Sequence, residues 1–280
     1  MENLSSAIEP FKRTGKPRFP LSVAAYSFRD FLKPKDPAEQ IDLFKFIDFC
    51  ADQGCEGTEL TSYYFPTPVT NDYLLKIKRH CFLRGIEVSG TAVGNNFALP
   101  KGGKLDAQIA SVKEWIDHAA VFGAPHIRVF GGAAAKGLSD AEARAMCIAS
   151  LEECCDYAGK KGIFLGLENH GGIVAEADAL LEIVHAVKSP WLGINLDSGN
   201  FHTADPYGDL AKCAPYAVNV QIKAVVRAKG AKESEPVDLR RIFKMLHDAN
   251  YQGYVALEYE GKEPWETVPT LLKQMKQFAV

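Results

Sequence analysis

Four side chains with oxygen donors lie at the ends of strand-like runs in the second half of the chain. They are Glu168 in IFLGLE, Asp197 in LGINLD, Gln221 in AVNVQIK and Glu258 in YVALE. Side chains alternate along a strand, so each of these residues faces away from the apolar residues of its own run. Carboxylates gathered in one place repel one another unless a cation lies among them, and an oxygen-rich set suits Mn2+ or Mg2+. The pattern predicts one divalent-metal site, the alternative being four separate salt-bridged or solvated residues.

Two more polar residues extend the same inward faces. His170 lies two residues beyond Glu168, and Lys223 lies two residues beyond Gln221. Both side chains lie on the face of their strand that carries a predicted ligand, so they point into the same mouth. We therefore expect these residues to bind substrate beside the metal.

Two charged residues earlier in the chain also point into the expected site. Glu59 ends a strand-like run, where it either contacts a substrate hydroxyl or forms a salt bridge with a neighbouring loop. Arg128 in HIRVF binds a substrate carboxylate or phosphate, or else a structural partner such as Glu87. His126 opens the same run at its other end and is interpreted as a structural residue.

Eight strand-like runs and eight amphipathic segments must position these side chains. The expected strands are 21–26, 55–60, 86–91, 126–130, 163–168, 192–197, 217–223 and 254–258. The expected helices lie near 37–53, 71–84, 105–122, 139–160, 176–187, 206–214, 237–249 and 265–277. Ser139 and Glu142 form a capping-box pattern, and Gly85, Gly123 and Gly162 stand where helices are expected to end.

The alternation of strand and helix requires parallel strand pairs, because a parallel connection needs a crossover. We predict a (β/α)8 TIM barrel in a single domain at 21–280, preceded by an N-terminal extension at 1–20. No GxGxxG follows the first strand, which disfavours the alternative of an open dinucleotide-binding sheet. The longer loops at 61–70, 92–104 and 224–236 then lie at the C-terminal face, where barrel active sites are built.

Composition excludes several classes of function. A formal net charge of −3 disfavours nucleic acid and acidic membrane surfaces as partners. The seven cysteines form no CxxC pair and are expected to be free thiols in a reducing compartment. The first twenty residues lack an apolar leader and no run is long enough to cross a membrane. These features predict a cytoplasmic protein, although a chain processed from a longer precursor would also lack its leader.

The motifs resemble those of the xylose isomerase-like barrel superfamily of sugar phosphate isomerases and epimerases. The resemblance rests on YSFRD (26–30), GCEGTEL (54–60), GLENHGG (166–172), LDSGNFH (196–202) and ALEYEG (256–261). It implies that Glu168, Asp197, Gln221 and Glu258 hold the metal and that the two Glu ligands form the acid–base pair. It also implies that His202 touches the substrate.

One segment departs from the epimerase pattern. Epimerases of this superfamily carry His-x-His-x-Lys-Asp in the seventh strand, where this chain has NVQIKA at 219–224. Gln221 can still bind a metal through its carbonyl oxygen. A Gln at this point resembles inosose dehydratases and some 3-dehydroshikimate dehydratases, which raises a lyase as an alternative.

The resemblance implies an isomerase or epimerase that acts on a small ketose, keto-sugar or cyclitol through a metal-stabilised enediolate. Mn2+ is the favoured ion, with Mg2+, Co2+ and Zn2+ as alternatives. A metal-dependent dehydratase is the second hypothesis, and a non-catalytic sugar-binding barrel is a more distant one. Endonuclease IV-type enzymes share the barrel, but they use a His-rich three-metal cluster that this sequence does not offer. A homo-oligomer is expected by resemblance only.

Overall fold

Eight parallel strands close into a barrel in the computed structural model, which describes residues 8–279. Around the barrel the order is β1, β10, β7, β6, β5, β4, β3 and β2, and β1 pairs with both β10 and β2. The strands are β1 (Leu21–Ala24), β2 (Gly57–Thr61), β3 (Glu87–Ala92), β4 (His126–Phe130), β5 (Phe164–Glu168), β6 (Leu192–Asp197), β7 (Ala217–Ile222) and β10 (Val255–Leu257). Closure confirms the predicted (β/α)8 barrel and excludes the open sheet.

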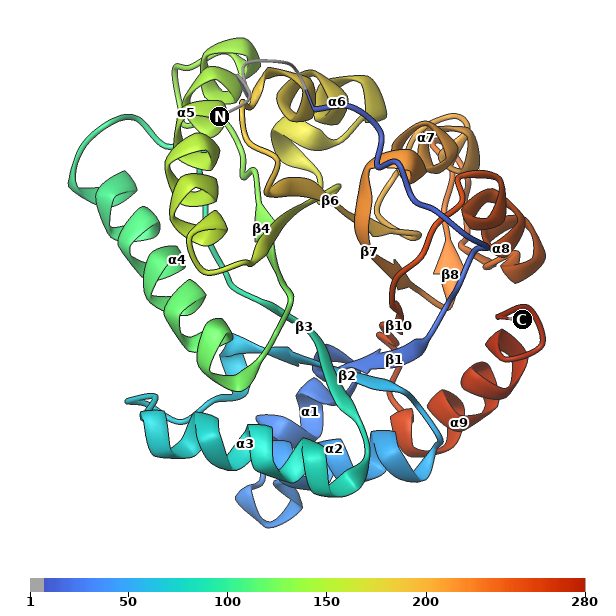
Figure 1. Ribbon diagram of the computed structural model, residues 1–280. Coiled ribbons are helices and arrows are strands. Elements are labelled where there is room, and N and C mark those ends of the chain that lie inside the picture. The colour runs from blue at the N-terminus through green and yellow to red at the C-terminus, as the bar shows by residue number, and fades with distance from the viewer. Residues whose placement is uncertain (1–7, 280) are drawn as a thin grey trace.

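The helices form a ring outside the strands (Figure 1). The main ones are α2 (Leu43–Asp52), α3 (Asn71–Arg84), α4 (Gly103–Phe122), α5 (Asp140–Gly159), α6 (Ala177–Ala186), α7 (Pro206–Cys213), α8 (Leu239–Asp248) and α9 (Pro264–Met275). Three of their ends follow the chemistry predicted from the sequence, whereas α5 ends at Gly159, before the predicted Gly162. Ser139 and Glu142 form the capping box of α5. Gly85 and Gly123 end α3 and α4 in the left-handed region, with φ of 65° and 90°, which glycine adopts without steric cost.

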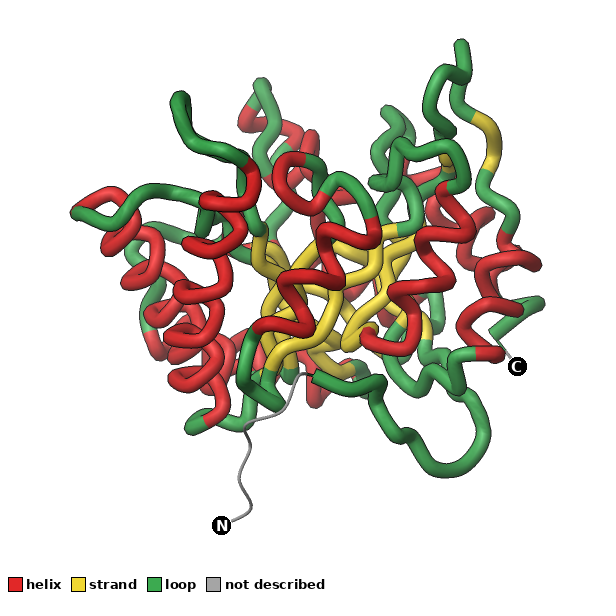
Figure 2. The backbone as a smooth tube through the Cα atoms, turned by 90° about the horizontal axis from the view of Figure 1, so that it is seen from above, coloured by secondary structure: helices red, strands yellow, loops and turns green. Residues whose placement is uncertain are grey.

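Three segments differ from the expectation. The helix expected near 37–53 begins only at Leu43, and Pro37–Glu39 form a separate 3-10 turn before it. The strand predicted at 21–26 ends at Ala24, because Ala25–Phe28 form a 3-10 turn that leads into a short, unexpected helix α1 (Arg29–Leu32). Ala25, Ser27 and Phe28 are all buried, and this spacing suits a helical turn rather than the strict alternation of a strand. The predicted loop 224–236 contains an antiparallel ribbon of β8 (Val225–Val226) and β9 (Glu235–Pro236). The ribbon stands on the side of the barrel where the long loops gather (Figure 2).

The two faces of the strands separate by polarity as predicted. Ile127, Leu165 and Ile194 belong to the hydrophobic core beneath the helices. Polar residues fill much of the barrel interior and are nonetheless buried; they include Ser22, Glu59, Arg128, Asn195, Asn219 and Gln221. All seven cysteines are buried and unpaired, as expected for free thiols. The interior of the barrel therefore contains buried polar and charged side chains that could take part in binding or catalysis.

The first described residues run beneath the barrel before entering β1 (Figure 2). The amide of Phe11 donates to the carbonyl of Pro215 at 3.1 Å, and Arg18 forms a parallel bridge with Gln252. The described part of the predicted extension is thus packed against the N-terminal ends of the strands, whereas 1–7 lie outside the described residues. Within 8–279, no helix combines the length and the apolar character needed to span a bilayer.

Candidate functional site

The four predicted ligands meet at the C-terminal mouth of the barrel. Asp197 pairs in register with Gln221 across β6 and β7, and Gln221 pairs with Ala256, two residues before Glu258. The exposed fractions are 3% for Glu168, 0% for Asp197, 1% for Gln221 and 8% for Glu258. Gln221 Nε2 donates to Glu258 Oε2 at 3.0 Å. Adjacent parallel strands have thus gathered polar side chains into a buried cluster, as the alternation pattern predicted.

Lys223 lies inside this cluster. Its Nζ is 2.6 Å from Glu258 Oε1, 2.8 Å from Glu260 Oε1 and 3.3 Å from Asp197 Oδ2. Burial acts to lower the pKa of Lys223, but the three carboxylates outweigh it and raise the pKa above its ordinary value. A Cβ on Gly199 would lie 2.7 Å from Lys223 Cδ, so only glycine there leaves room for this side chain. The ammonium group neutralises part of the acidic charge of the site.

Arg128 supplies the second cation. Its Nε is 2.9 Å from Glu168 Oε2, and its Nη1 donates to the carbonyl of Val93 at 3.0 Å. Burial raises the pKa of Glu168 to about 8, although Arg128 acts in the opposite direction. The structural partner proposed from the sequence was wrong, since Glu87 instead accepts a hydrogen bond from Tyr254 Oη at 2.8 Å. Register around the closed barrel brings Arg128 toward β5 rather than toward the start of β3.

Asn200 is a contact residue that the sequence analysis did not single out. Its Nδ2 donates to Glu168 Oε1 at 2.8 Å, so both oxygens of Glu168 have a partner. Asn200 follows β6 in the segment LDSGNFH, which was already prominent for Asp197 and His202. Its position three residues after a predicted ligand was the available indication.

A layer of amides supports the cluster from below. Glu59 is 1% exposed and accepts hydrogen bonds from Asn219 Nδ2 at 2.8 Å and from Gln221 Nε2 at 2.6 Å. Asn195 Nδ2 donates to Gln221 Oε1 at 2.6 Å. Burial, followed by repulsion from Glu258, raises the pKa of Glu59 to about 7. Within residues 8–279, Glu59 therefore forms no salt bridge with a loop and orients Gln221 instead.

The two predicted substrate-binding histidines lie at the rim. The ring of His170 packs 4.6 Å from that of Phe130, measured between centroids, and burial followed by the charge of Arg128 lowers the pKa of His170. His202 is exposed, with Nδ1 3.2 Å from the carbonyl oxygen of Arg227. Neither histidine ring forms a hydrogen bond with Glu168 or with another of the four predicted ligands.

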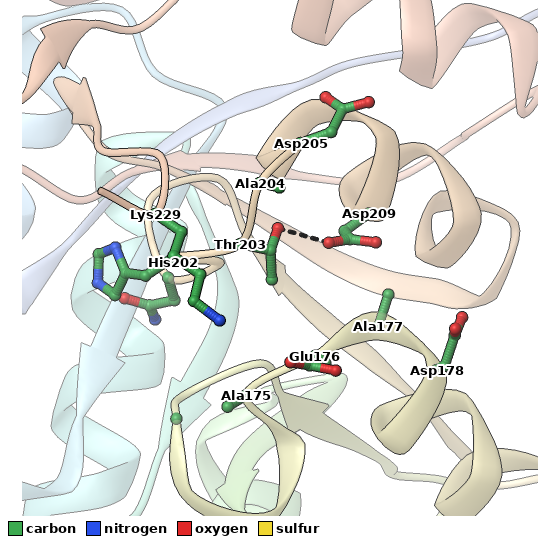
Figure 3. Close-up of a pocket in the computed structure, with 12 residues that line it drawn as sticks. Ala175, Glu176, Ala177, Asp178, His202, Thr203, Ala204, Asp205, Asp209 and Lys229 are labelled. Atoms are coloured by element: carbon green, nitrogen blue, oxygen red, sulfur yellow. Dashed lines mark hydrogen bonds between the residues drawn. The ribbon is translucent and has the colours of Figure 1, made fainter. Parts of the chain in front are cut away.

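A side cavity of about 570 Å3 adjoins the cluster between the loops after β5 and β6. Asn200 lines it and also holds Glu168, so the cavity and the cluster share one side chain. His202 and Lys229 lie together on one side of the cavity, with Glu176 and Asp178 across from them (Figure 3). The cavity offers room and polar groups for the part of a substrate that does not react.

The cluster has the donor chemistry of a divalent-metal site. It offers three carboxylates and an amide, and among residues 8–279 the buried Asp197 Oδ2 has the Lys223 ammonium group at 3.3 Å as its one polar partner. Hard cations such as Mn2+ and Mg2+ take such oxygen donors. Among residues 8–279, however, no group of three or more His, Cys, Asp or Glu side chains is arranged to hold a metal. Lys223 is placed between Asp197 and Glu258, and Gln221 Oε1 accepts a hydrogen bond from Asn195. The donors therefore fit a metal only if the ammonium group withdraws and the amide turns its oxygen toward the carboxylates.

The family model described as xylose isomerase-like TIM barrel matches residues 47–277. A putative hydroxypyruvate isomerase of Xenopus laevis is 25% identical over 173 residues, which are 56% of this chain and 62% of that protein. The chain thus spans less than two thirds of that relative.

Solved structures of epimerases and dehydratases share the fold. A D-psicose 3-epimerase from Clostridium cellulolyticum H10 with D-tagatose aligns at a TM-score of 0.77, with 13% identity over 93% of this chain and 99% of that one. The probable 3-DHS dehydratase AsbF of Bacillus anthracis aligns at 0.68, with 17% identity over 92% and 98%. The IOLI protein with a bound zinc atom aligns at 0.73, with 16% identity over 94% and 97%. At these identities the likeness shows the fold alone.

Proposed function

Because the chain belongs to the xylose isomerase-like TIM barrel family, whose matched relatives include isomerases, epimerases and a dehydratase, we propose that it is a metal-dependent isomerase or epimerase. The substrate class is a small ketose, keto-sugar or cyclitol. The observation that supports this most strongly is the convergence of Glu168, Asp197, Gln221 and Glu258 at one mouth of the barrel, where all four side chains are buried.

Glu168 and Glu258 are the proposed proton-transfer pair. They come from β5 and from the end of β10, on different sides of the mouth. Glu168 is buried, and Arg128 and Asn200 hold its two oxygens, which fixes the carboxylate where it can exchange a proton with the substrate. Glu258, held by Lys223, is the proposed base that removes the proton next to the carbonyl.

Lys223 and Arg128 bring positive charge to the reacting oxygens. Both are buried, so their charges act with little screening by water. Glu168, Asp197, Gln221 and Glu258 would hold the metal, which supplies further positive charge to stabilise an enediolate when bound. The remainder of the substrate extends toward the side cavity lined by Asn200 and His202.

Elemental analysis of protein purified without chelator tests the metal site. We expect about one equivalent of metal in the parent protein and much less in Glu258→Gln. Glu260→Gln is the matched control, because Glu260 also contacts Lys223 but lies outside the proposed ligand set. Equal metal content in all three proteins, or none in the parent after reconstitution with Mn2+, would remove the main support for the proposal.

Incubation of candidate ketoses, keto-sugars and ketoinositols in deuterated water tests the chemistry. An isomerase or epimerase incorporates deuterium next to the carbonyl and conserves the composition of the substrate. A dehydratase is the second candidate, favoured by Gln221 in β7 and by the fold shared with a probable 3-DHS dehydratase. It releases water, which mass spectrometry of the product detects. Absence of both exchange and water loss with every substrate class would favour a binding protein.

A cytoplasmic location and a homo-oligomeric assembly are also proposals. Cell fractionation with an antibody to the chain tests the first. Light scattering coupled to gel filtration tests the second.

A further inference from the structure

A second cavity lies at the opposite end of the barrel from Glu168. It has a volume of about 370 Å3, within the range of small-molecule sites. Its wall comes from the start of β4, the start of β5, the residues just before β10 and the N-terminal segment that runs beneath the barrel (Figure 2). The proposed reaction uses none of these residues.

Two buried side-chain atoms in this wall have no hydrogen-bond partner in the described part of the chain. His126 is 4% exposed and Ser89 is 1% exposed, and neither His126 Nε2 nor Ser89 Oγ makes a hydrogen bond with the described residues. Buried polar side chains normally have a hydrogen-bond partner. A Cβ on Gly90 would lie 2.0 Å from His126 Cε1, so glycine at this position makes room for the ring. Two unpartnered groups in one wall therefore indicate that a polar ligand belongs there.

The charged side chains that line this cavity are both positive. Lys12 and Arg13 line the cavity, and the wall contains no Asp or Glu. Arg13 Nη2 donates to the carbonyl of Ala217 at 2.5 Å, whereas Nη1 has no hydrogen-bond partner among residues 8–279. Desolvation lowers the pKa of Arg13, in keeping with a cation that has no carboxylate beside it. In a chain with a net charge of −3, this concentration of positive charge favours an anion.

Aromatic rings complete the cavity. The rings of Phe11 and Phe164 meet edge to face, with 5.9 Å between centroids, and both line the wall. A Cβ on Gly193 would lie 3.1 Å from Phe11 Cε2, so Phe11 fits closely into the strand ends. The side cavity near Glu168 differs, because its lining includes four carboxylates (Figure 3).

We propose that this N-terminal cavity is a binding site for a small organic carboxylate that carries a ring and a hydroxyl group. The carboxylate pairs with Arg13, the ring packs against Phe11 and Phe164, and the hydroxyl bonds with Ser89 or His126. The site is separate from the proposed catalytic cluster and does not depend on its chemistry.

Calorimetric titration of the full chain with 4-hydroxybenzoate tests the site. We expect binding in the millimolar range or tighter, and binding weaker by about tenfold or more for neutral 4-hydroxybenzyl alcohol, which lacks the carboxylate. Arg13→Gln should weaken the binding of 4-hydroxybenzoate by about the same factor. Lys16→Gln is the matched control, because Lys16 is an exposed cation of the same segment that does not line the cavity. This variant should bind 4-hydroxybenzoate with the affinity of the parent protein.

Two further measurements keep the test independent of the folding of Arg13→Gln. Ser89→Ala should weaken the binding of 4-hydroxybenzoate more than the binding of benzoate, because only 4-hydroxybenzoate has a hydroxyl group. Glu258→Gln, at the other end of the barrel, should bind 4-hydroxybenzoate as the parent does. The proposal is overturned if the parent does not bind 4-hydroxybenzoate, if the neutral alcohol binds equally well, or if binding is lost in Glu258→Gln but kept in Ser89→Ala and Arg13→Gln.

Discussion

Replacing Lys223 with Met removes the cation at the centre of the acidic cluster. Lys223 Nζ contacts three carboxylates within 3.3 Å, of which Asp197 is fully buried and Glu258 is 8% exposed. Leaving buried charges unpaired costs about 3–5 kcal/mol. We expect the lower end, about 3 kcal/mol, because burial already raises the pKa of Asp197 to about 7 and this carboxyl can take up a proton. For a chain of 280 residues that is a Tm lower by roughly 5 °C.

Adding Mn2+ should restore most of the stability that Lys223→Met loses. In Lys223→Met no ammonium group competes for the space between Asp197 and Glu258, so the metal should raise Tm more in the variant than in the parent. Saturation to about 100 times Kd corresponds to about 2.7 kcal/mol. Differential scanning calorimetry with and without Mn2+ measures both effects, and Lys229→Met, which removes an exposed cation at the rim, is the matched control. The reasoning fails if Lys223→Met melts like the parent and Mn2+ changes neither protein.

Three other changes test separate parts of the structure. Glu168→Gln should keep the fold but lower the rate of deuterium exchange into an accepted substrate by about a thousandfold, and a rate near that of the parent would contradict its role in proton transfer. Asn200→Ala removes a hydrogen bond to Glu168 Oε1 and should lower kcat by about tenfold, whereas a change in KM alone would show that Asn200 only binds substrate. Burial lowers the pKa of His126 from 6.5 to about 4. Between these two pH values, His126 is protonated in the unfolded chain but not in the folded chain. The free energy of unfolding should therefore fall as the pH drops from 6.5 to 4, by up to about 3 kcal/mol, and urea titrations of His126→Gln should show a smaller fall.

The sequence by itself determined the order of the elements and the polarity of each strand. The strand predicted at 126–130 coincides with β4, and the helix predicted at 71–84 coincides with α3. These features are local, because hydrophobic periodicity and end-capping residues act within a few positions of the chain. The same alternation identified Glu168, Asp197, Gln221 and Glu258 as residues of one mouth, since parallel strands align their C-terminal ends.

The tertiary structure alone decided which of these polar groups touch. Asn219 binds Glu59 from 160 positions away, and Arg128 binds Glu168 rather than Glu87. Such partners depend on barrel closure and on register, which shifts between Thr58 and Glu59 and again between Ile194 and Asn195. A shift of one residue moves a side chain to the other face of a strand. The position of Lys223 among the carboxylates follows from the same closure, because its partners come from β6 and from the chain beyond β10, brought to either side of β7 by the barrel order.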